Sequence, residues 1–217
     1  ACEIVRQRKK DLILVTDSQT DAGEMLIAGG CLKKLETAYL WVGVIGMGYN
    51  YRRAMEKGIP NYLEVEDYSN LGMSMRFMAG AFGLPFMPTK SMLGTDIAAK
   101  NPNIKIIEDP FGTGPIALVP AARPDVAFVH VQRADIYGNA QIWGAFMNDD
   151  LIARAAEKVI LTCEKIVPTS ELRKIPNMTA INAYSVTAVV ELPFGCHPLG
   201  VTGCYWVDNP FRQDIME

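Results

Sequence analysis

The sequence predicts an α/β fold, with an open, mostly parallel sheet flanked by helices. Short apolar, β-branched runs recur along the chain, and several are apolar at nearly every position, as is typical of parallel strands covered on both faces. Segments with helical spacing alternate with these runs, which favours a parallel sheet. The expected strands cover residues 11–16, 38–45, 104–107, 116–120, 126–131, 158–163 and 186–192.

Helical segments are expected between these strands. The helix expected over residues 50–58 runs from a capping Asn50 to a terminating Gly58, and the helix expected over residues 148–158 starts on a capping Asn148. Residues 1–10 read as the second half of an amphipathic helix. The other expected helices cover residues 22–30, 50–58, 69–83 and 148–158.

The length of 217 residues favours one α/β domain over residues 1–217. An apolar fraction of 49% and a charged fraction of 21% are ordinary for a globular protein with a sizeable core. No repeat, low-complexity segment or linker divides the chain. Because it opens inside a helical pattern and stops without a terminator, we expect this sequence to begin and end inside a longer domain.

Composition excludes several classes of function. The net charge of −3 argues against a general nucleic-acid or anionic-membrane binder. No uninterrupted apolar stretch of about 18 residues is present, and the N-terminus lacks a signal-peptide pattern. We therefore expect a soluble, cytoplasmic protein with no nucleic-acid or membrane partner.

Cysteine and histidine usage predicts no metal site. The five cysteines are scattered and odd in number, and none are spaced as CxxC, so neither a disulfide framework nor a zinc site is expected. Most of them are interpreted as buried, small apolar side chains. His130 and His197 are too few for a histidine-rich site, and His197 is interpreted as packed and hydrogen-bonded.

Three polar segments are candidate sites. Two of them, 65–72 and 17–23, follow strand-like runs, and ligands of open parallel sheets gather at strand carboxyl ends. The third, 88–96, is a polar loop in which Gly94 could let backbone approach a ligand, with an ordinary loop as the alternative. In "VEDYSNLG" (65–72), Ser69 and Asn70 lie at the N-terminus of the long helix, where amides favour a carboxylate, a phosphate or a developing oxyanion. The alternative is plain helix capping by Asp67 or Ser69. The other two segments are "DSQTDAG" (17–23), with Ser18, and "PTKSMLGTD" (88–96), with Gly94 and Thr95.

The segment "RADIYGNAQIWG" (133–144) is interpreted first as a tight turn at a strand end, with a site as the alternative. Gly138 is expected to supply a positive φ, and Asp135 and Asn139 to fix the turn. The run "ELPFGCHPLGVTGCYWVDNP" (191–210) suggests a surface segment that contacts a partner or bounds a cleft. No GxxxxGK[ST] or helix-opening GxGxxG motif is present, so no nucleotide cofactor is expected.

Six segments, in order, resemble the alpha subunit of family I CoA-transferases, closest to the glutaconate CoA-transferase branch. They are "MLIAGGCLKKLETAY", "NYRRAMEKG", "VEDYSNLGMSMRFMAGAFGLPFMP", "SMLGTD", "RPDVAFVHVQRADIYGNAQIWG" and "ELPFGCHPLGVTGCYWVDNP". The resemblance spans almost all 217 residues. It implies the CoA-transferase (NagB-like) fold, with the family's N-terminal strand and C-terminal extension outside this sequence.

The resemblance also implies a mechanism and a partner. A glutamate of a beta subunit, in a Glu-x-Gly context, attacks the acyl-CoA thioester and then carries CoA as a glutamyl thioester before a second carboxylate collects it. The coenzyme A thioester is thus a substrate, and no cofactor is bound permanently. Glu56-Lys57-Gly58 mimics the tripeptide, but Gly58 is interpreted as a helix C-cap and Glu56 as solvated.

Asn70 matches an amide position, usually Gln, of the family's alpha subunits, and an amide there could donate to the thioester carbonyl as it gains negative charge. In relatives that open a steroid-derived ring, a glutamate in this stretch does the chemistry, and a small alignment shift would place Glu66 there. The alternatives are a ring-opening CoA-thioester hydrolase with Glu66 as base and a non-catalytic scaffold subunit. The candidate substrate-binding residues are Ser69, Gly94, Thr95 and Ser18, and the acid substrate is left open.

Overall fold

A computed structural model describes residues 1–19, 21–40, 46–145 and 147–216. The chain forms two compact units, one of residues 1–76, 86–120 and 212 onward, the other of residues 77–85 and 121–211. The expectation of a single domain stays a prediction. The described helices and strands are α1 (Cys2–Arg6), β1 (Leu12–Val15), β2 (Ser18–Gln19), α2 (Asp21–Ala28), β3 (Leu32–Thr37), β4 (Tyr39–Leu40), α3 (Tyr49–Lys57), β5 (Glu64–Asp67), α4 (Asn70–Ala81), β6 (Phe86–Thr89), α5 (Asp96–Lys100), β7 (Lys105–Glu108), β8 (Pro115–Pro120), β9 (Val126–Ala134), β10 (Ala140–Gln141), α6 (Asp149–Ala155), β11 (Lys158–Ile166), α7 (Thr169–Leu172), β12 (Thr179–Ile181), β13 (Ala188–Glu191) and α8 (Asn209–Met216), with 3-10 turns at Pro176–Met178 and Ala183–Ser185.

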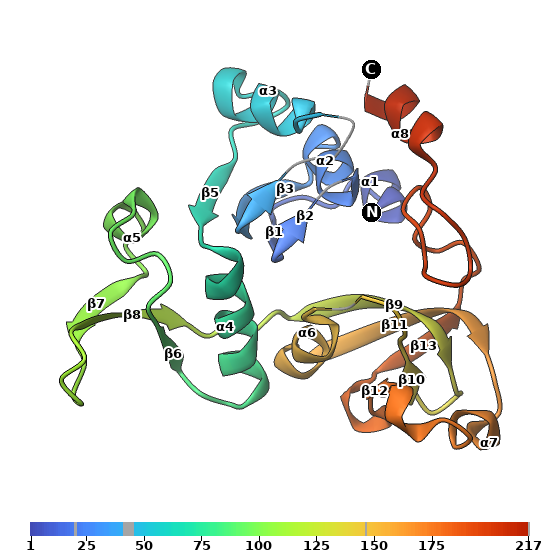
Figure 1. Cartoon of the computed structure of the whole chain (residues 1–217). Coiled ribbons are helices and arrows are strands. Elements are labelled where there is room, and N and C mark those ends of the chain that lie inside the picture. Colours follow the sequence, from blue (N-terminus) through green and yellow to red (C-terminus); the bar gives the residue numbers. More distant parts are fainter. Residues whose placement is uncertain (20, 41–45, 146, 217) are drawn as a thin grey trace. The chain divides into compact units, whose positions relative to one another are not determined.

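The first unit is built on the parallel sheet β1-β3-β5. One face of this sheet buries Leu35 of β3 completely, with Leu26 and Ile27 of α2 and Ala54 of α3 packed in the same cluster. Burial of one such leucine contributes about 1.5–3 kcal/mol. The α/β fold with open parallel sheets and flanking helices is therefore confirmed for this part of the chain, as Figure 1 shows.

The N-terminus of α3 is capped by a side chain from another helix. The buried Glu24 carboxylate of α2 accepts hydrogen bonds from the amides of Asn50 (2.7 Å) and Tyr51 (2.9 Å). The N-cap is Gly48, two residues before the expected Asn50, so the prediction that Asn50 is the cap is wrong. Gly58 ends the helix in the left-handed region (φ 65°), which confirms it as the C-cap.

A second sheet of this unit, β6-β8-β7, is antiparallel, which corrects the prediction that residues 104–107 and 116–120 belong to a parallel sheet. The physical reason is the short connection between β7 and β8, which permits a hairpin and no crossover. Asp109 organises that turn: its carboxylate accepts hydrogen bonds from the amides of Phe111 (2.9 Å) and Thr113 (3.3 Å) and from the Thr113 hydroxyl.

The expected strand over residues 38–45 is described only at β4, which pairs with β2 in parallel. Residues 41–45 of that prediction lie outside the described part of the chain. The prediction of a helix over residues 69–83 is confirmed by α4, and Asn148 is confirmed as the N-cap of α6.

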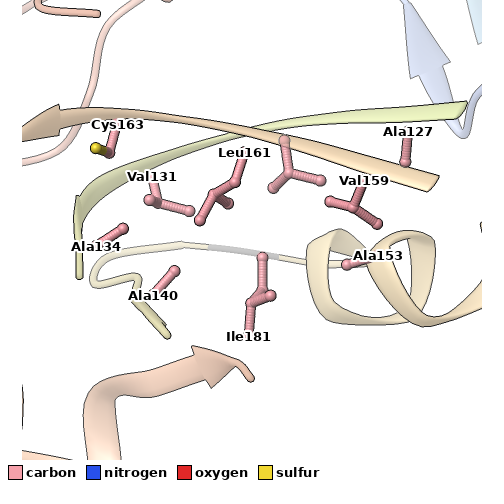
Figure 2. Packing of buried hydrophobic residues seen from close by; sticks show 10 residues of the cluster. Ala127, Val131, Ala134, Ala140, Ala153, Val159, Leu161, Cys163 and Ile181 are labelled. Atoms are coloured by element: carbon pink, nitrogen blue, oxygen red, sulfur yellow. The ribbon is translucent and has the colours of Figure 1, made fainter. Parts of the chain in front are cut away.

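The second unit holds a five-stranded sheet in the order β12-β10-β9-β11-β13. The pairs β9–β11 and β11–β13 are parallel, as expected, and the short β10 runs antiparallel to both of its neighbours. Figure 2 shows the core on one face of this sheet, where Val131 of β9 and Leu161 of β11 point toward Ile181 of β12. Ala153 brings α6 into the same core, because an alanine lets the helix approach closely.

The turn after β9 is fixed by its own polar side chains, as predicted. The fully buried Asp135 accepts hydrogen bonds from the amides of Tyr137 and Asn139 (both 3.0 Å), from the Asn139 side-chain amide (2.9 Å) and from the Thr169 hydroxyl (2.9 Å). Gly138 has φ +99°, which confirms the expected positive φ. A Cβ on Gly138 would lie 2.6 Å from the Val186 side chain, so the turn also packs too closely for any other residue.

The structure also tests the predictions for His197 and for the cysteines. His197 is packed against Phe211, with ring centroids 4.7 Å apart, and its Nε2 lies 3.1 Å from the Asp208 carboxylate, as expected of a packed, hydrogen-bonded histidine. Of the cysteines, Cys31 and Cys163 are buried, but Cys2 and Cys204 are exposed, so the interpretation of most cysteines as buried is wrong. Within the described residues, no helix is long and apolar enough to cross a membrane.

Candidate functional site

The candidate residues of the first unit lie at the carboxyl edge of the β1-β3-β5 sheet. Backbone and side-chain hydrogen bonds join the strand ends in a row: the Thr37 hydroxyl donates to the Asp17 carbonyl (3.1 Å), and the Tyr68 amide donates to the Thr37 carbonyl (3.0 Å). Ser18 is exposed beside the end of β1, at one side of β3. Ser69 and Asn70 follow β5, at the other side of β3.

Ser69 caps α4. Its hydroxyl accepts a hydrogen bond from the Gly72 amide at 3.0 Å and lies 2.5 Å from the Ser91 hydroxyl. The alternative cap, Asp67, is the last residue of β5, and its carbonyl accepts a hydrogen bond from the Asn101 side-chain amide (2.9 Å). Capping by Ser69 leaves the exposed Asn70 as the first residue of a twelve-residue helix. The positive end of the helix dipole therefore lies at the Asn70 side chain.

The loop Ser91–Thr95 packs against this helix end. The Ser69 amide lies 3.3 Å from the Met92 sulfur, and a Cβ on Gly72 would lie 3.0 Å from the Met92 methyl group. Thr95 closes the loop by donating its hydroxyl proton to the Met92 carbonyl at 2.6 Å. Gly94 is exposed with φ +74° and has no atom within 4 Å of the position that a Cβ would occupy. The structure thus brings Ser69, Gly94 and Thr95 to one end of α4.

Glu66 is not a free carboxylate. It is buried in β5, and its two oxygens are taken by Lys34 Nζ (2.5 Å) and by the Tyr68 hydroxyl, a very short contact. Burial raises the pKa of Glu66, but the hydrogen bonds from Lys34 and Tyr68 outweigh burial and hold the pKa below its ordinary value. The carboxylate stays ionised and paired, which is the state of a structural ion pair and unfavourable for a general base.

The ion pair of Glu66 belongs to a larger charged network on the second face of the sheet. Lys34 Nζ also lies 2.9 Å from the Glu36 carboxylate, which receives Arg76 of α4 at 2.7 Å. The Arg76 guanidinium stands over the Tyr68 ring, 4.2 Å from its centroid. All of these side chains are at most 16% exposed, so the charges are paired away from water. The sequence alone does not predict this network.

A cavity of about 280 Å³ opens beside Glu66. Asp67, Asp96 and Asn101 line it, together with Lys100. Burial raises the pKa of Asp67 above its ordinary value. Within the described residues, no group of three or more histidine, cysteine, aspartate or glutamate side chains is arranged to hold a metal ion.

Glu56 of the tripeptide Glu56-Lys57-Gly58 is exposed and pairs with Arg52 one helical turn earlier, at 2.6 Å. This confirms the interpretation of Glu56 as a solvated helix residue. The Asp135 carboxylate is occupied by hydrogen bonds that hold the turn, so the interpretation of residues 133–144 as a turn fits the structure.

The chain matches a family model described as Coenzyme A transferase over residues 1–192. The A-subunit of the 3-oxoadipate CoA-transferase of Pseudomonas knackmussii is 39% identical over 213 residues, covering 97% of this chain and 74% of the relative. The A-subunit of the glutaconate CoA-transferase of Acidaminococcus fermentans is 34% identical over 228 residues, covering 97% and 70%. The crystal structure of that enzyme superposes with a TM-score of 0.86, covering 97% of this chain and 71% of that one.

Two further relatives frame the comparison. An uncharacterized protein of Archaeoglobus fulgidus is 42% identical over 208 residues, and this chain spans only 46% of its length. The cholesterol ring-cleaving hydrolase IpdA subunit of Mycobacterium tuberculosis is 28% identical over 223 residues, covering 99% of this chain and 75% of the relative. The family model and the two CoA-transferase relatives agree with the resemblance seen in the sequence, and the chain belongs to the coenzyme A transferase family, on its alpha-subunit branch.

Proposed function

We propose that this chain is the alpha subunit of a cytoplasmic, heteromeric CoA-transferase that moves CoA between an acyl-CoA and a free carboxylic acid. The observation that carries the proposal lies at the N-terminus of α4, where the Ser69 hydroxyl caps the helix and the Asn70 side-chain amide is left exposed. A side-chain amide at a helix N-terminus can donate a hydrogen bond to a thioester carbonyl as it gains negative charge.

The nucleophile is proposed to come from the beta subunit, in the form of a glutamate that forms the glutamyl-CoA thioester. Within this chain, Glu66 is tied to Lys34 and Tyr68, and Glu56 is exposed on a helix end. Neither is placed at the Asn70 amide as an activated carboxylate. Ser69, Gly94 and Thr95 shape the α4 end of the substrate site, and Ser18 contributes from the other side of the sheet edge. Coenzyme A takes part as substrate, with no permanently bound cofactor.

A ring-opening hydrolase is the second candidate, and the 28% identity to the ring-cleaving hydrolase subunit is what favours it. That activity would use Glu66 as the base. The paired oxygens and lowered pKa of Glu66 favour the transferase instead.

One experiment separates the candidates. The chain is co-expressed with the beta-like subunit that co-purifies with it, and the complex is incubated with an acyl-CoA and a free acid. A transferase delivers CoA to the acid, at a rate that depends on the acid. Net thioester or ring cleavage without transfer would reject the transferase. Failure of any beta-like protein to co-purify would count against both enzymes.

A further inference from the structure

The second unit contains a larger cavity, of about 500 Å³, at the carboxyl ends of β9 and β11. Volumes of about 300–1,000 Å³ are typical of small-molecule sites, and carboxyl ends of parallel strands are where such sites gather. The lining includes two cations, two carboxylates, an indole and an apolar wall: Arg133, Lys165, Glu164, Glu171, Trp143 and Ile166–Pro168.

The two cations stand side by side. Arg133 and Lys165 are Cα partners on neighbouring parallel strands, so their side chains leave the same face of the sheet, with backbones about 4.8 Å apart. The Arg133 guanidinium carbon lies 5.5 Å from the centroid of the Trp143 ring. A charge pair next to an aromatic surface suits an anionic ligand that carries a planar ring.

The orientation of Arg133 is set by a buried amide. Arg133 Nε donates to the Gln141 side-chain oxygen at 2.8 Å. Gln141 is fully buried, and its Nε2 donates to the carbonyls of Leu172 (2.9 Å) and Ile175 (2.8 Å) and to the Thr179 hydroxyl (3.2 Å). The amide therefore cannot turn, and the guanidinium is held in place before any ligand arrives.

The carboxylates that line the cavity have partners of their own. Glu164 accepts hydrogen bonds from the Tyr205 hydroxyl and the Phe194 amide (both 2.8 Å) and lies 2.7 Å from His130 Nε2. Glu171 is paired with Lys174 at 2.7 Å.

The cations have fewer partners. In the described part of the chain, neither the terminal nitrogens of Arg133 nor Lys165 Nζ has a hydrogen-bond or ion-pair partner. The Arg133 charge still acts in the cavity, because it helps Lys174 to lower the pKa of Glu171.

We propose that this cavity binds a nucleotide, with its phosphate between Arg133 and Lys165 and its ring against Trp143 and the apolar wall. A planar, forked guanidinium matches phosphate oxygens in pairs, and the neighbouring ammonium adds a point charge. The volume suits a nucleotide better than a short carboxylic acid, which would leave most of the cavity empty. The nucleotide has two possible sources: the phosphorylated adenosine end of coenzyme A, which rests on the proposed function, and a free adenine nucleotide, which does not.

Calorimetric titration of the purified full chain tests the proposal. The probes are adenosine 3′,5′-bisphosphate, which matches coenzyme A, ADP, which represents free nucleotides, and inorganic phosphate. We expect saturable binding of at least one nucleotide and weaker binding of phosphate. Arg133→Gln and Lys165→Gln should each weaken nucleotide binding about tenfold or more, and Trp143→Phe less. Lys158→Gln, an exposed lysine at the opposite end of β11, is the matched control and should leave binding within twofold.

Absence of nucleotide binding, or equal weakening by the control variant, would overturn the proposal. A preference for adenosine 3′,5′-bisphosphate identifies coenzyme A as the source, and a preference for ADP identifies a free nucleotide. The outcome is independent of the transfer assay. If the transferase is active but binds no nucleotide at this cavity, and its R133Q variant keeps its KM for acyl-CoA, the result rejects this inference and leaves the proposed function standing. If the complex binds nucleotide here but transfers no CoA, the result rejects the proposed function and leaves this inference standing.

Discussion

Lys34 and Glu66 form a buried ion pair across the β3–β5 ladder, with 2.5 Å between Nζ and the carboxylate oxygen. The pair makes Glu66, a buried carboxylate near the candidate site, a structural residue that stabilises the sheet.

Replacing Lys34 with Met should lower the free energy of unfolding by about 3 kcal/mol, because Glu66 and Glu36 would remain buried without their shared cation. Urea denaturation of the variant and wild type measures this difference. Lys33→Met, on the exposed neighbour in the same strand, is the control and should change stability by less than about 0.5 kcal/mol. Equal effects of the two variants would show that the ion pair does not support the sheet.

Replacing Asp135 with Asn should cost about 2 kcal/mol, because an amide nitrogen cannot accept the hydrogen bonds that the Asn139 side chain and the Thr169 hydroxyl donate to Oδ2. Burial raises the pKa of Asp135, but the hydrogen bonds it accepts outweigh burial and hold the pKa below its ordinary value.

The lowered pKa gives this loss a pH dependence. The carboxylate's contribution is fully present above its unfolded pKa of about 3.9 and is lost as pH falls through the lower, folded pKa. The difference in denaturation midpoint between wild type and variant, measured from pH 7 to pH 3, should therefore stay constant down to about pH 4 and shrink below it. Curves that stay parallel throughout would contradict the assigned role.

Gly138→Ala should destabilise the protein more than Gly83→Ala, by about 1–2 kcal/mol. Both glycines have a positive φ, of +99° and +70°, so both substitutions strain the backbone. At Gly138 the new Cβ would also meet Val186 at 2.6 Å, whereas at Gly83 it would meet nothing within 4 Å. Thermal melting of the two variants separates the packing cost from the backbone cost, and equal shifts in Tm would disprove the close packing of the turn.

Asn70→Ala should lower kcat for CoA transfer about 100-fold and leave the KM for acyl-CoA nearly unchanged, because the lost hydrogen bond forms only as charge develops on the thioester oxygen. Steady-state kinetics of the assembled complex measure both constants. Asn177→Ala, on an exposed asparagine of the second unit, is the matched control. A change in KM alone would make Asn70 a ground-state binding residue.

Much of this architecture is predictable from the sequence because apolar runs and capping residues act locally. Continuous apolar runs predict the strands over residues 126–131 and 158–163, and β9 and β11 extend them to Ala134 and Ile166. The turn at Asp135 follows from the same logic, since a short polar side chain bonds the amides beside it.

The features that escaped prediction depend on contacts between distant segments. β3 reads LKKLET, and its charged residues hide a strand whose second face is polar and buried. No local sequence pattern near Lys34 predicts its ion pair with Glu66, 32 residues away, or the ion pair of Arg76 with Glu36. Two leucines set among three charged residues are the one signal that could have suggested a strand with a buried polar face.

The capping of α3 by Glu24 is invisible for the same reason. The carboxylate belongs to α2, 26 residues before Asn50, so local capping rules place the helix start on the wrong residue. Candidate residues at the end of α4 were predictable because Ser69 caps its own helix, three residues before the amide that it accepts from.

The most direct test of the central claim locates the covalent intermediate. The complex is incubated with acyl-CoA, treated with borohydride to reduce the glutamyl thioester, digested and mapped by mass spectrometry. The account predicts loss of activity with one reduced glutamate in the partner chain and none in this chain, in wild type and in the Glu66→Gln variant alike. A reduced glutamate in this chain, or inactivation that disappears when Glu66 is replaced, would contradict it.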